Sequence, residues 1–212
     1  MTGKLTALVV DYGGVLTNPL RETMGAWFSA ERIDEQRFAA VMREWLAEGA
    51  EVNLVHQLEK GEISPAEFER QFAGLLVRED GSIPDAEGML RRMFAGFRDN
   101  EGMVGVVGRA RAAGLRTALL SNSWGNEYDQ DLLDRLFDTA VISGEVGLRK
   151  PEPEIYRLTA SRLGVAPAEC VFVDDLAPNV RGAVAVGMVG VHHIDTETTL
   201  AELEALFEVP LR

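Results

Sequence analysis

Strand-like and helix-like segments alternate from residue 100 to the end of the chain, and this alternation most constrains the fold. Apolar runs of strand length occupy residues 115–120, 139–142, 170–173 and 188–192. The segments between them carry the three-to-four-residue apolar spacing of amphipathic helices. Strands and helices that alternate in this way form parallel sheets through right-handed crossovers. The pattern predicts an α/β fold, a doubly wound parallel sheet with helices on both faces.

A further apolar run near the start ends in an acid and a glycine pair. Residues 8–10 read as a strand buried on both faces, and Asp11, Tyr12, Gly13 and Gly14 follow directly. Open α/β sheets bind ligands beyond the carboxyl ends of their strands, so we expect Asp11 at the ligand-binding edge. Gly13 and Gly14 allow sharp turning and close approach of a ligand to the backbone.

Residues 17–99 follow a different pattern, with helix after helix. Asp34 is placed to cap one helix, and residues 64–67 (Ser-Pro-Ala-Glu) form a capping box at the start of another. Apolar stripes run along four helical segments: Met24, Trp27 and Phe28; Phe38, Val41, Met42, Trp45 and Leu46; Phe68, Phe72, Leu75 and Leu76; and Met89, Leu90, Met93, Phe94 and Phe97. We therefore predict a catalytic core of residues 1–16 and 100–212, with residues 17–99 inserted as a helical cap.

Composition excludes several classes of partner. The chain has 212 residues, 46% of them hydrophobic, which is ordinary for a soluble globular protein with one core and a smaller inserted unit. A net charge of −13 argues against nucleic acid or an anionic membrane as the main partner. Cys170 is the single cysteine, so we expect no internal disulfide and a cytoplasmic location. The sequence shows no signal-peptide pattern and no apolar run of the ~20 residues that a membrane helix needs.

Polar residues follow three of the predicted strands. They are Asp11, the pair Ser121 and Asn122, and the pair Asp174 and Asp175. The carboxyl ends of parallel strands share one edge of a sheet, so we expect these side chains to converge there. Lys150, held extended before a proline, is a candidate to join them from a loop.

Such a group of side chains suits a phosphoryl group. Three nearby carboxylates repel one another unless a cation neutralises them, and Mg²⁺ prefers oxygen ligands of this kind. Lys150 supplies a positive charge, and Ser121 with the following backbone N–H groups supplies donors for phosphoryl oxygens. Asp11 is then available as a carboxylate nucleophile. Taken alone, each element is ordinary turn or capping chemistry, and the prediction rests on their combination.

Four motifs in this order resemble those of the haloacid dehalogenase superfamily of phosphohydrolases. They lie at residues 11–16 (Asp-Tyr-Gly-Gly-Val-Leu), 120–122 (Leu-Ser-Asn), 147–151 (Gly-Leu-Arg-Lys-Pro) and 173–175 (Val-Asp-Asp), the last followed by Asn179. The helical insert is similar to the cap of the branch that contains sugar-phosphate phosphatases and the phosphatase domain of soluble epoxide hydrolase. The resemblance covers essentially the whole chain.

The resemblance implies a role for each matched residue. Asp11 would be the nucleophile and a Mg²⁺ ligand, and Lys150 would balance its charge and that of the phosphate. Ser121, helped by the backbone N–H of Asn122, would bind phosphoryl oxygens in a pocket shared with Gly14. The carbonyl of Gly13 and the carboxylate of Asp175 would be Mg²⁺ ligands. Asp174 would act through water or orient the site.

Gly13 departs from the family pattern. That position usually holds a second Asp that serves as general acid and base, a contribution of about 10²–10⁴-fold. We therefore predict slow hydrolysis of small phosphorylated metabolites, best with good leaving groups such as acyl or aryl phosphates. His56, Glu59 and Glu62 are candidates for a replacement acid from the cap, although a packing or surface role on a helix is the commoner use of such residues.

Two alternative functions and the oligomeric state stay open. A haloacid dehalogenase would use the same nucleophile without metal, but Asp174 and Asp175 would repel its anionic substrate. A non-catalytic phosphate-ligand binder or regulatory protein would keep the site and lose turnover, which Gly13 favours. A homodimer through exposed apolar residues of the bundle is compatible with either function. The candidates for the entrance to the site are Tyr12, Asn18, Trp124 and Asn126.

Overall fold

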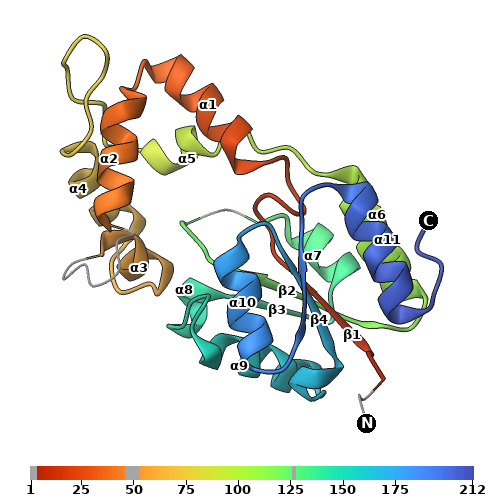
Figure 1. Ribbon diagram of the computed structural model, residues 1–212. Coiled ribbons are helices and arrows are strands. Elements are labelled where there is room, and N and C mark those ends of the chain that lie inside the picture. Colours follow the sequence, from red (N-terminus) through yellow and green to blue (C-terminus); the bar gives the residue numbers. More distant parts are fainter. Residues whose placement is uncertain (1–3, 46–52, 126–127) are drawn as a thin grey trace.

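A five-stranded sheet forms the centre of the molecule in the computed structural model, which describes residues 4–45, 53–125 and 128–212 (Figure 1). Its strands are β1 (Ala7–Val10), β2 (Arg116–Ser121), β3 (Thr139–Ile142), β4 (Cys170–Asp174) and β5 (Val189–His192). Their order is β3-β2-β1-β4-β5, and every pair is parallel. The predicted doubly wound α/β sheet is confirmed.

Helices cover both faces of the sheet. They are α6 (Glu101–Ala112), α7 (Gln130–Leu136), α8 (Ser143–Val146), α9 (Pro153–Leu163), α10 (Ala177–Ala185) and α11 (Thr196–Phe207), with a 3₁₀ turn at Pro167–Glu169. Leu8 and Val10 of β1 pack with α6, α7 and α11, whereas Ala7 and Val9 pack with α9 and α10. This alternation is the two-residue period of a strand buried on both faces, so the central strand is apolar throughout.

The segment between β1 and α6 folds into a group of helices with its own apolar core. They are α1 (Leu20–Glu31), α2 (Glu35–Trp45), α3 (Leu54–Glu59), α4 (Pro65–Ala73) and α5 (Met89–Met93). Figure 1 shows them gathered beside the sheet layers. The predicted stripes meet in one cluster around Phe68 and Phe72, both fully buried. Phe97 is an exception, because it packs against the core cluster that contains Tyr12. The apolar cluster of the insert is separate from the two clusters that flank the sheet, which supports our division of the chain into a core and a cap. That division stays a proposal.

The two connections between the core and the helices of the insert lie side by side. Thr17 pairs with Asp99 in an isolated antiparallel bridge, and the Asn100 N–H donates to the Leu16 carbonyl at 2.8 Å. The Asn18 N–H donates to the Arg98 carbonyl, and the Arg98 N–H donates back to Asn18 Oδ1, both at 2.9 Å. The chain therefore leaves the core and returns to it through one short paired segment.

Local capping follows the sequence in part. The Asp34 carboxylate accepts from the Gln36 and Arg37 N–H groups, which confirms that cap. Ser64 accepts from the Glu67 N–H, but the Glu67 side chain binds Arg70 and Gln71, so only half of that capping box forms.

The sequence placed the start of the last helix incorrectly. Residues 199–202 (Thr-Leu-Ala-Glu) have the sequence of a capping box, which predicts that the helix starts there. In the structure α11 begins at Thr196, because the Asp195 carboxylate accepts from the Thr198 N–H at 2.8 Å. Thr199 is buried within the helix and contacts His193 instead. Leu46, assigned to an apolar stripe, lies outside the described residues. Within the described ranges, none of the helices combines the length and apolar character needed to span a membrane.

We expect Phe72→Ala to destabilise the helical insert by about 3–5 kcal/mol, because it leaves a cavity among Trp45, Phe68 and Phe38. All three tryptophans of the chain lie in or against this cluster, so their fluorescence reports on its unfolding. Denaturant titration followed by tryptophan fluorescence measures the change. Ile83→Ala, at a side chain that is 62% exposed, is the control and should shift stability by less than about 0.5 kcal/mol. Equal effects of the two substitutions would contradict the assignment of this core.

Candidate active site

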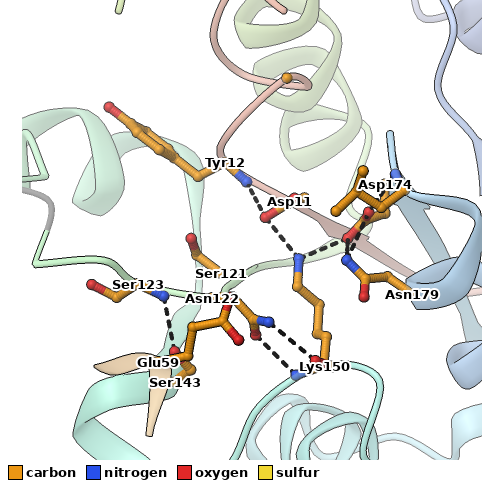
Figure 2. Close-up of polar contacts among 12 residues, drawn as sticks. Asp11, Tyr12, Glu59, Ser121, Asn122, Ser123, Ser143, Lys150, Asp174 and Asn179 are labelled. Carbon is orange, nitrogen blue, oxygen red and sulfur yellow. Dashed lines mark hydrogen bonds and ion pairs between the residues drawn. The ribbon is translucent and has the colours of Figure 1, made fainter. Parts of the chain in front are cut away.

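The polar residues at the carboxyl ends of β1, β2 and β4 meet at one edge of the sheet, as the sequence predicts. Val10 lies in register with Leu119 of β2 and Val173 of β4. The Asp11 N–H continues the ladder by donating to the Val173 carbonyl at 2.9 Å. Asp11 therefore leaves the central strand between the ends of its two neighbours, and Figure 2 shows it close to Lys150 and Asp174.

Lys150 is the centre of the site. Its side chain is 1% exposed, and its Nζ lies 2.7 Å from Asp11 Oδ1 and 2.7 Å from Asp174 Oδ2. Burial by itself lowers the pKa of Lys150. The charges of Asp11 and Asp174 raise it by more than burial lowers it, so the net shift is upward. Lys150 is therefore a permanent cation that neutralises part of the charge of two buried acids.

Asp11 has an unusual electrostatic environment. Burial raises the pKa of its carboxyl to about 8, although Lys150 lowers it and Asp174 raises it again. The Tyr12 N–H donates to Asp11 Oδ1 at 2.7 Å, the same oxygen that Lys150 contacts. Within the described part of the chain, both of these donors bind one oxygen and leave Oδ2 available for another ligand.

The two acids at the end of β4 have different surroundings. Asp174 is fully buried and accepts from the Leu176 N–H, from Asn179 Nδ2 and from Lys150 Nζ, at 2.7–3.1 Å. Asp175 is half-buried, and burial followed by the charge of Asp174 raises its pKa to about 6. Asp174 has its lone pairs occupied by protein donors, so Asp175 is the freer ligand of the two.

The carboxylates fit a hard divalent cation. Asp11, Asp174 and Asp175 can each offer one oxygen, and these oxygens lie within 4.8 Å of one another. Burial, and to a lesser extent the charge of Asp174, raises the pKa of Asp11 and of Asp175, and a bound cation would offset both effects. An all-oxygen donor set of this charge is the kind that binds Mg²⁺.

Gly14 makes room for Asp175. Its φ is 75°, and a Cβ at that position would lie 2.3 Å from Asp175 Oδ2. A side chain at residue 14 would therefore displace the acid as well as strain the backbone. Gly13 is different, because a Cβ there would have Phe97 Cζ as its nearest contact at 4.0 Å. Residue 13 thus has space for a Cβ atom that the glycine does not fill.

The loops after β2 and β3 hold each other in place through Asn122. Its Oδ1 accepts from the Lys150 N–H at 2.9 Å, and its Nδ2 donates to the Lys150 carbonyl at 3.1 Å. Next to it, the Ser123 N–H donates to Ser143 Oγ at 2.8 Å. Asn122 therefore fixes the backbone of the loop that carries Lys150, a role that the sequence motif does not reveal.

Tyr128 is a site residue that sequence reasoning missed. Its hydroxyl donates to Ser121 Oγ at 3.0 Å, and its ring packs 4.9 Å from that of Tyr12. Burial raises the pKa of the Tyr128 hydroxyl, so the group stays protonated at neutral pH. With Oγ accepting from Tyr128, the Ser121 proton is free to be donated elsewhere. The sequence offers no signal for this contact beyond the nearness of an aromatic residue to the motif.

The candidate acids from the cap are engaged elsewhere or exposed. Glu59 accepts from Trp124 Nε1 at 3.0 Å and from Arg149 Nε at 2.5 Å. Burial, and then the charge of Arg149, lowers the pKa of His56. Glu62 is exposed. Glu59 is therefore an ion-pair partner, and the structure gives no contact that joins His56 or Glu62 to Asp11.

The predicted entrance residues have packing and connecting roles. Tyr12 is 8% exposed and packs edge-on against Phe97. Asn18 binds Thr23 and the connection to residue 98. Trp124 packs with the apolar cluster of the insert. Asn126 lies outside the described residues.

Comparison with known proteins identifies the family. The family model of haloacid dehalogenase-like hydrolases matches residues 5–187, which include every residue of the site described above. This chain belongs to that family. The haloacid dehalogenase-like fold is also that of a solved HAD family enzyme from Bacteroides thetaiotaomicron, in complex with magnesium and inorganic phosphate. That match has a TM-score of 0.64 and 24% identity, covering 89% of this chain and 93% of the other.

Two curated relatives show the range of this hydrolase family. Sesquiterpene phosphatase astK from Aspergillus oryzae is 29% identical over 160 residues, which is 71% of this chain and 77% of that protein. Bifunctional epoxide hydrolase 2 from rat is 34% identical over 113 residues, 50% of this chain and 20% of that protein. The chain thus spans only a fifth of the length of the epoxide hydrolase, and a tenth of another curated relative.

We expect Mg²⁺ to bind more tightly as the pH rises from about 5.5 to about 8, because Asp11 and Asp175 must lose protons to become ligands. Their raised pKa values stabilise the metal-free fold below pH ~4, and this contribution is lost as the pH rises through 6 and 8. The increase in Tm caused by Mg²⁺ should therefore be larger at the higher pH. Thermal denaturation with and without Mg²⁺ at both pH values measures it.

Asp175→Asn is the matched variant for this experiment and should remove most of the Mg²⁺-induced increase in Tm. Asp131→Asn, at an exposed acid of α7, should leave it unchanged. The same increase at both pH values, or in Asp175→Asn, would show that Asp11 and Asp175 do not hold the ion.

Proposed function

We propose that this hydrolase is a Mg²⁺-dependent phosphohydrolase of small phosphorylated metabolites that forms an aspartyl-phosphate on Asp11. The observation that carries the proposal is the ion pair of Asp11 with the buried Lys150, at 2.7 Å, beside two further carboxylates. A phosphatase among the relatives, and a structural neighbour crystallised with magnesium and inorganic phosphate, support it.

Each residue has a task in the proposed reaction. Asp11 attacks phosphorus through a carboxylate oxygen, and the leaving-group oxygen departs with the bonding electron pair. Lys150 neutralises charge shared between Asp11 and the phosphoryl group, and Ser121 donates its hydroxyl proton to a phosphoryl oxygen. The backbone N–H of Asn122 adds a second donor. Water then attacks the aspartyl-phosphate, releases phosphate and restores the Asp11 carboxylate.

The acids and one carbonyl would hold the cation. Asp11, Asp175 and the Gly13 carbonyl would bind Mg²⁺, with Asp174 orienting Lys150 and Asn179 rather than binding directly. When bound, Mg²⁺ supplies positive charge against the phosphoryl oxygens and orients them for attack. The four protein hydrogen bonds and ion contacts of Asp174 support its indirect role.

Gly13 favours a second candidate function, a phosphate-ligand binder with little or no turnover. Without a carboxyl at residue 13, protonation of the leaving group and activation of water lose their usual agent. Such a protein would form the adduct on Asp11 and fail to release it. A dehalogenase is less compatible with the site, because three clustered carboxylates would repel an anionic haloacid. A cytoplasmic location and a homodimer stay predictions.

We expect Asp11→Asn to lower kcat/KM by at least about 10³-fold, because it removes the nucleophile. The assay is release of phosphate from a panel of phosphorylated metabolites and p-nitrophenyl phosphate, with Mg²⁺ and with a chelator. Asp131→Asn is the control and should retain full activity. Activity that survives both the chelator and Asp11→Asn would overturn the proposal. A BeF₃⁻ adduct on Asp11 in a protein that turns over no substrate would favour the binder.

We expect Gly13→Asp to raise the rate on alkyl phosphates by about 10²–10⁴-fold, because it returns an acid and base to the site. The space around residue 13 accepts a Cβ atom, whose nearest contact would be Phe97 Cζ at 4.0 Å. The gain should be smaller for p-nitrophenyl phosphate, whose leaving group needs no proton. Gly13→Ala controls for the added Cβ. Equal rates for Gly13→Asp and Gly13→Ala, or a parent protein that already cleaves alkyl phosphates as fast as p-nitrophenyl phosphate, would contradict this expectation.

A further inference from the structure

Glu59 is a buried acid of the insert whose carboxylate is shared by two residues of the core. It ends α3 and is 6% exposed. Trp124 Nε1 donates to Oε1 at 3.0 Å, and Arg149 Nε donates to Oε2 at 2.5 Å. The Arg149 side chain is itself only 13% exposed, so the ion pair is shielded from water. Each oxygen of this carboxylate therefore has its own donor, and the two donors come from separate loops.

Those two loops are the ones that carry the phosphoryl-binding residues. Trp124 lies three residues after Ser121, and Arg149 directly precedes Lys150. The Asn122 side chain already joins the loops near the sheet through its two bonds to the Lys150 backbone. Glu59 joins them a second time from the side of the insert. A residue outside the core thus contacts both the Ser121 loop and the Lys150 loop.

Packing holds α3 against the core at the same place. The Trp124 ring lies 5.6 Å from Phe68 and 6.2 Å from Phe94, both residues of the insert. Lys60 pairs with Glu152 at 2.6 Å. Gly61 approaches α8 so closely that a Cβ there would lie 2.6 Å from the Gly144 carbonyl oxygen. These contacts fix the end of α3 on the core and bring Glu59 between its partners.

The chemistry of the contact requires a carboxylate. Glu59 faces two N–H donors, one of them charged, and an acceptor-only group is the one side chain that satisfies both. A glutamine of the same size has one oxygen and one NH₂, so either Trp124 or Arg149 would face another donor. Removing the charge also leaves the Arg149 guanidinium buried without a counter-charge.

We propose that Glu59 is a positioning residue. Through it, the contact of α3 with the core fixes the relative position of the loops that carry Ser121 and Lys150. Ser121 and Lys150 then reach one phosphoryl group together only while α3 is docked on the core. Glu59 is not the missing proton donor but the link between the insert and phosphate affinity. The inference rests on the proposed function, because it assigns Ser121 and Lys150 to a phosphoryl group.

The test compares Glu59→Gln with Glu79→Gln. Glu79 is an exposed acid of the same insert that pairs with Arg32 at 3.0 Å, so it controls for loss of a glutamate–arginine pair. Calorimetry with Mg²⁺ gives the Kd of inorganic phosphate, and p-nitrophenyl phosphate gives kcat and KM. We expect Glu59→Gln to weaken phosphate binding about tenfold to a hundredfold and to lower kcat. Glu79→Gln should stay within about twofold of the parent.

Trp124→Phe separates positioning from folding. It keeps an aromatic ring against Phe68 and Phe94, and it removes the indole N–H that donates to Glu59 together with part of the ring volume. We expect it to weaken phosphate binding, and we expect the double variant with Glu59→Gln to lose less than the sum of the two effects. If Glu59→Gln does not fold, Trp124→Phe carries the same measurement. A lowered Tm with unchanged phosphate affinity in either variant would overturn the proposal.

Phosphate binding by the parent protein separates failure of the proposed function from failure of the role given to Glu59. If it binds neither inorganic phosphate nor BeF₃⁻ in the presence of Mg²⁺, the proposed function fails and this inference fails with it. If the parent binds phosphate, and both Glu59→Gln and Trp124→Phe bind it equally well, only the role of Glu59 is wrong.

Discussion

The site depends on one interaction, the burial of a lysine between two carboxylates. Lys150 could not stay charged at 1% exposure without Asp11 and Asp174, and those acids could not be gathered without it. The sheet topology makes the arrangement possible, since β1 lies between β2 and β4 and places Asp11 beside the end of each. Asn122 then holds the Lys150 backbone, and Asn179 holds Asp174, so the charges have little freedom to separate.

The insert contributes to this site mostly through its contacts with loops. Trp124, in the loop after β2, packs against the apolar cluster of the insert. Glu59 of the insert accepts a hydrogen bond from Arg149, in the loop that carries Lys150. The side chains of the insert thereby act at a distance from the reacting group.

Local sequence patterns predicted the strands and the residues at their ends, but they did not predict contacts between residues far apart in the chain. Apolar runs with polar ends revealed the strands and placed Asp11, Ser121 and Asp174 at one edge, because strand direction determines that outcome. The contact of Tyr128 with Ser121 depends on how a loop folds back, and nothing in the local pattern encodes it. Glu59 looked like a free acid for the same reason, since its partners lie 65 and 90 residues away. The start of α11 was misplaced because two capping signals compete within five residues, and the structure uses Asp195.

The paired connections at Thr17 and Asp99 have a consequence for how such a protein can change over time. Both ends of the insert are paired with each other, so the intervening chain forms a single closed loop as seen from the core. The entropy of closing a loop depends only weakly on its length. Helices can therefore be added, lost or exchanged between residues 17 and 99 while the core keeps its register. A catalytic sheet with such an attachment point can acquire new substrates without rebuilding its chemistry.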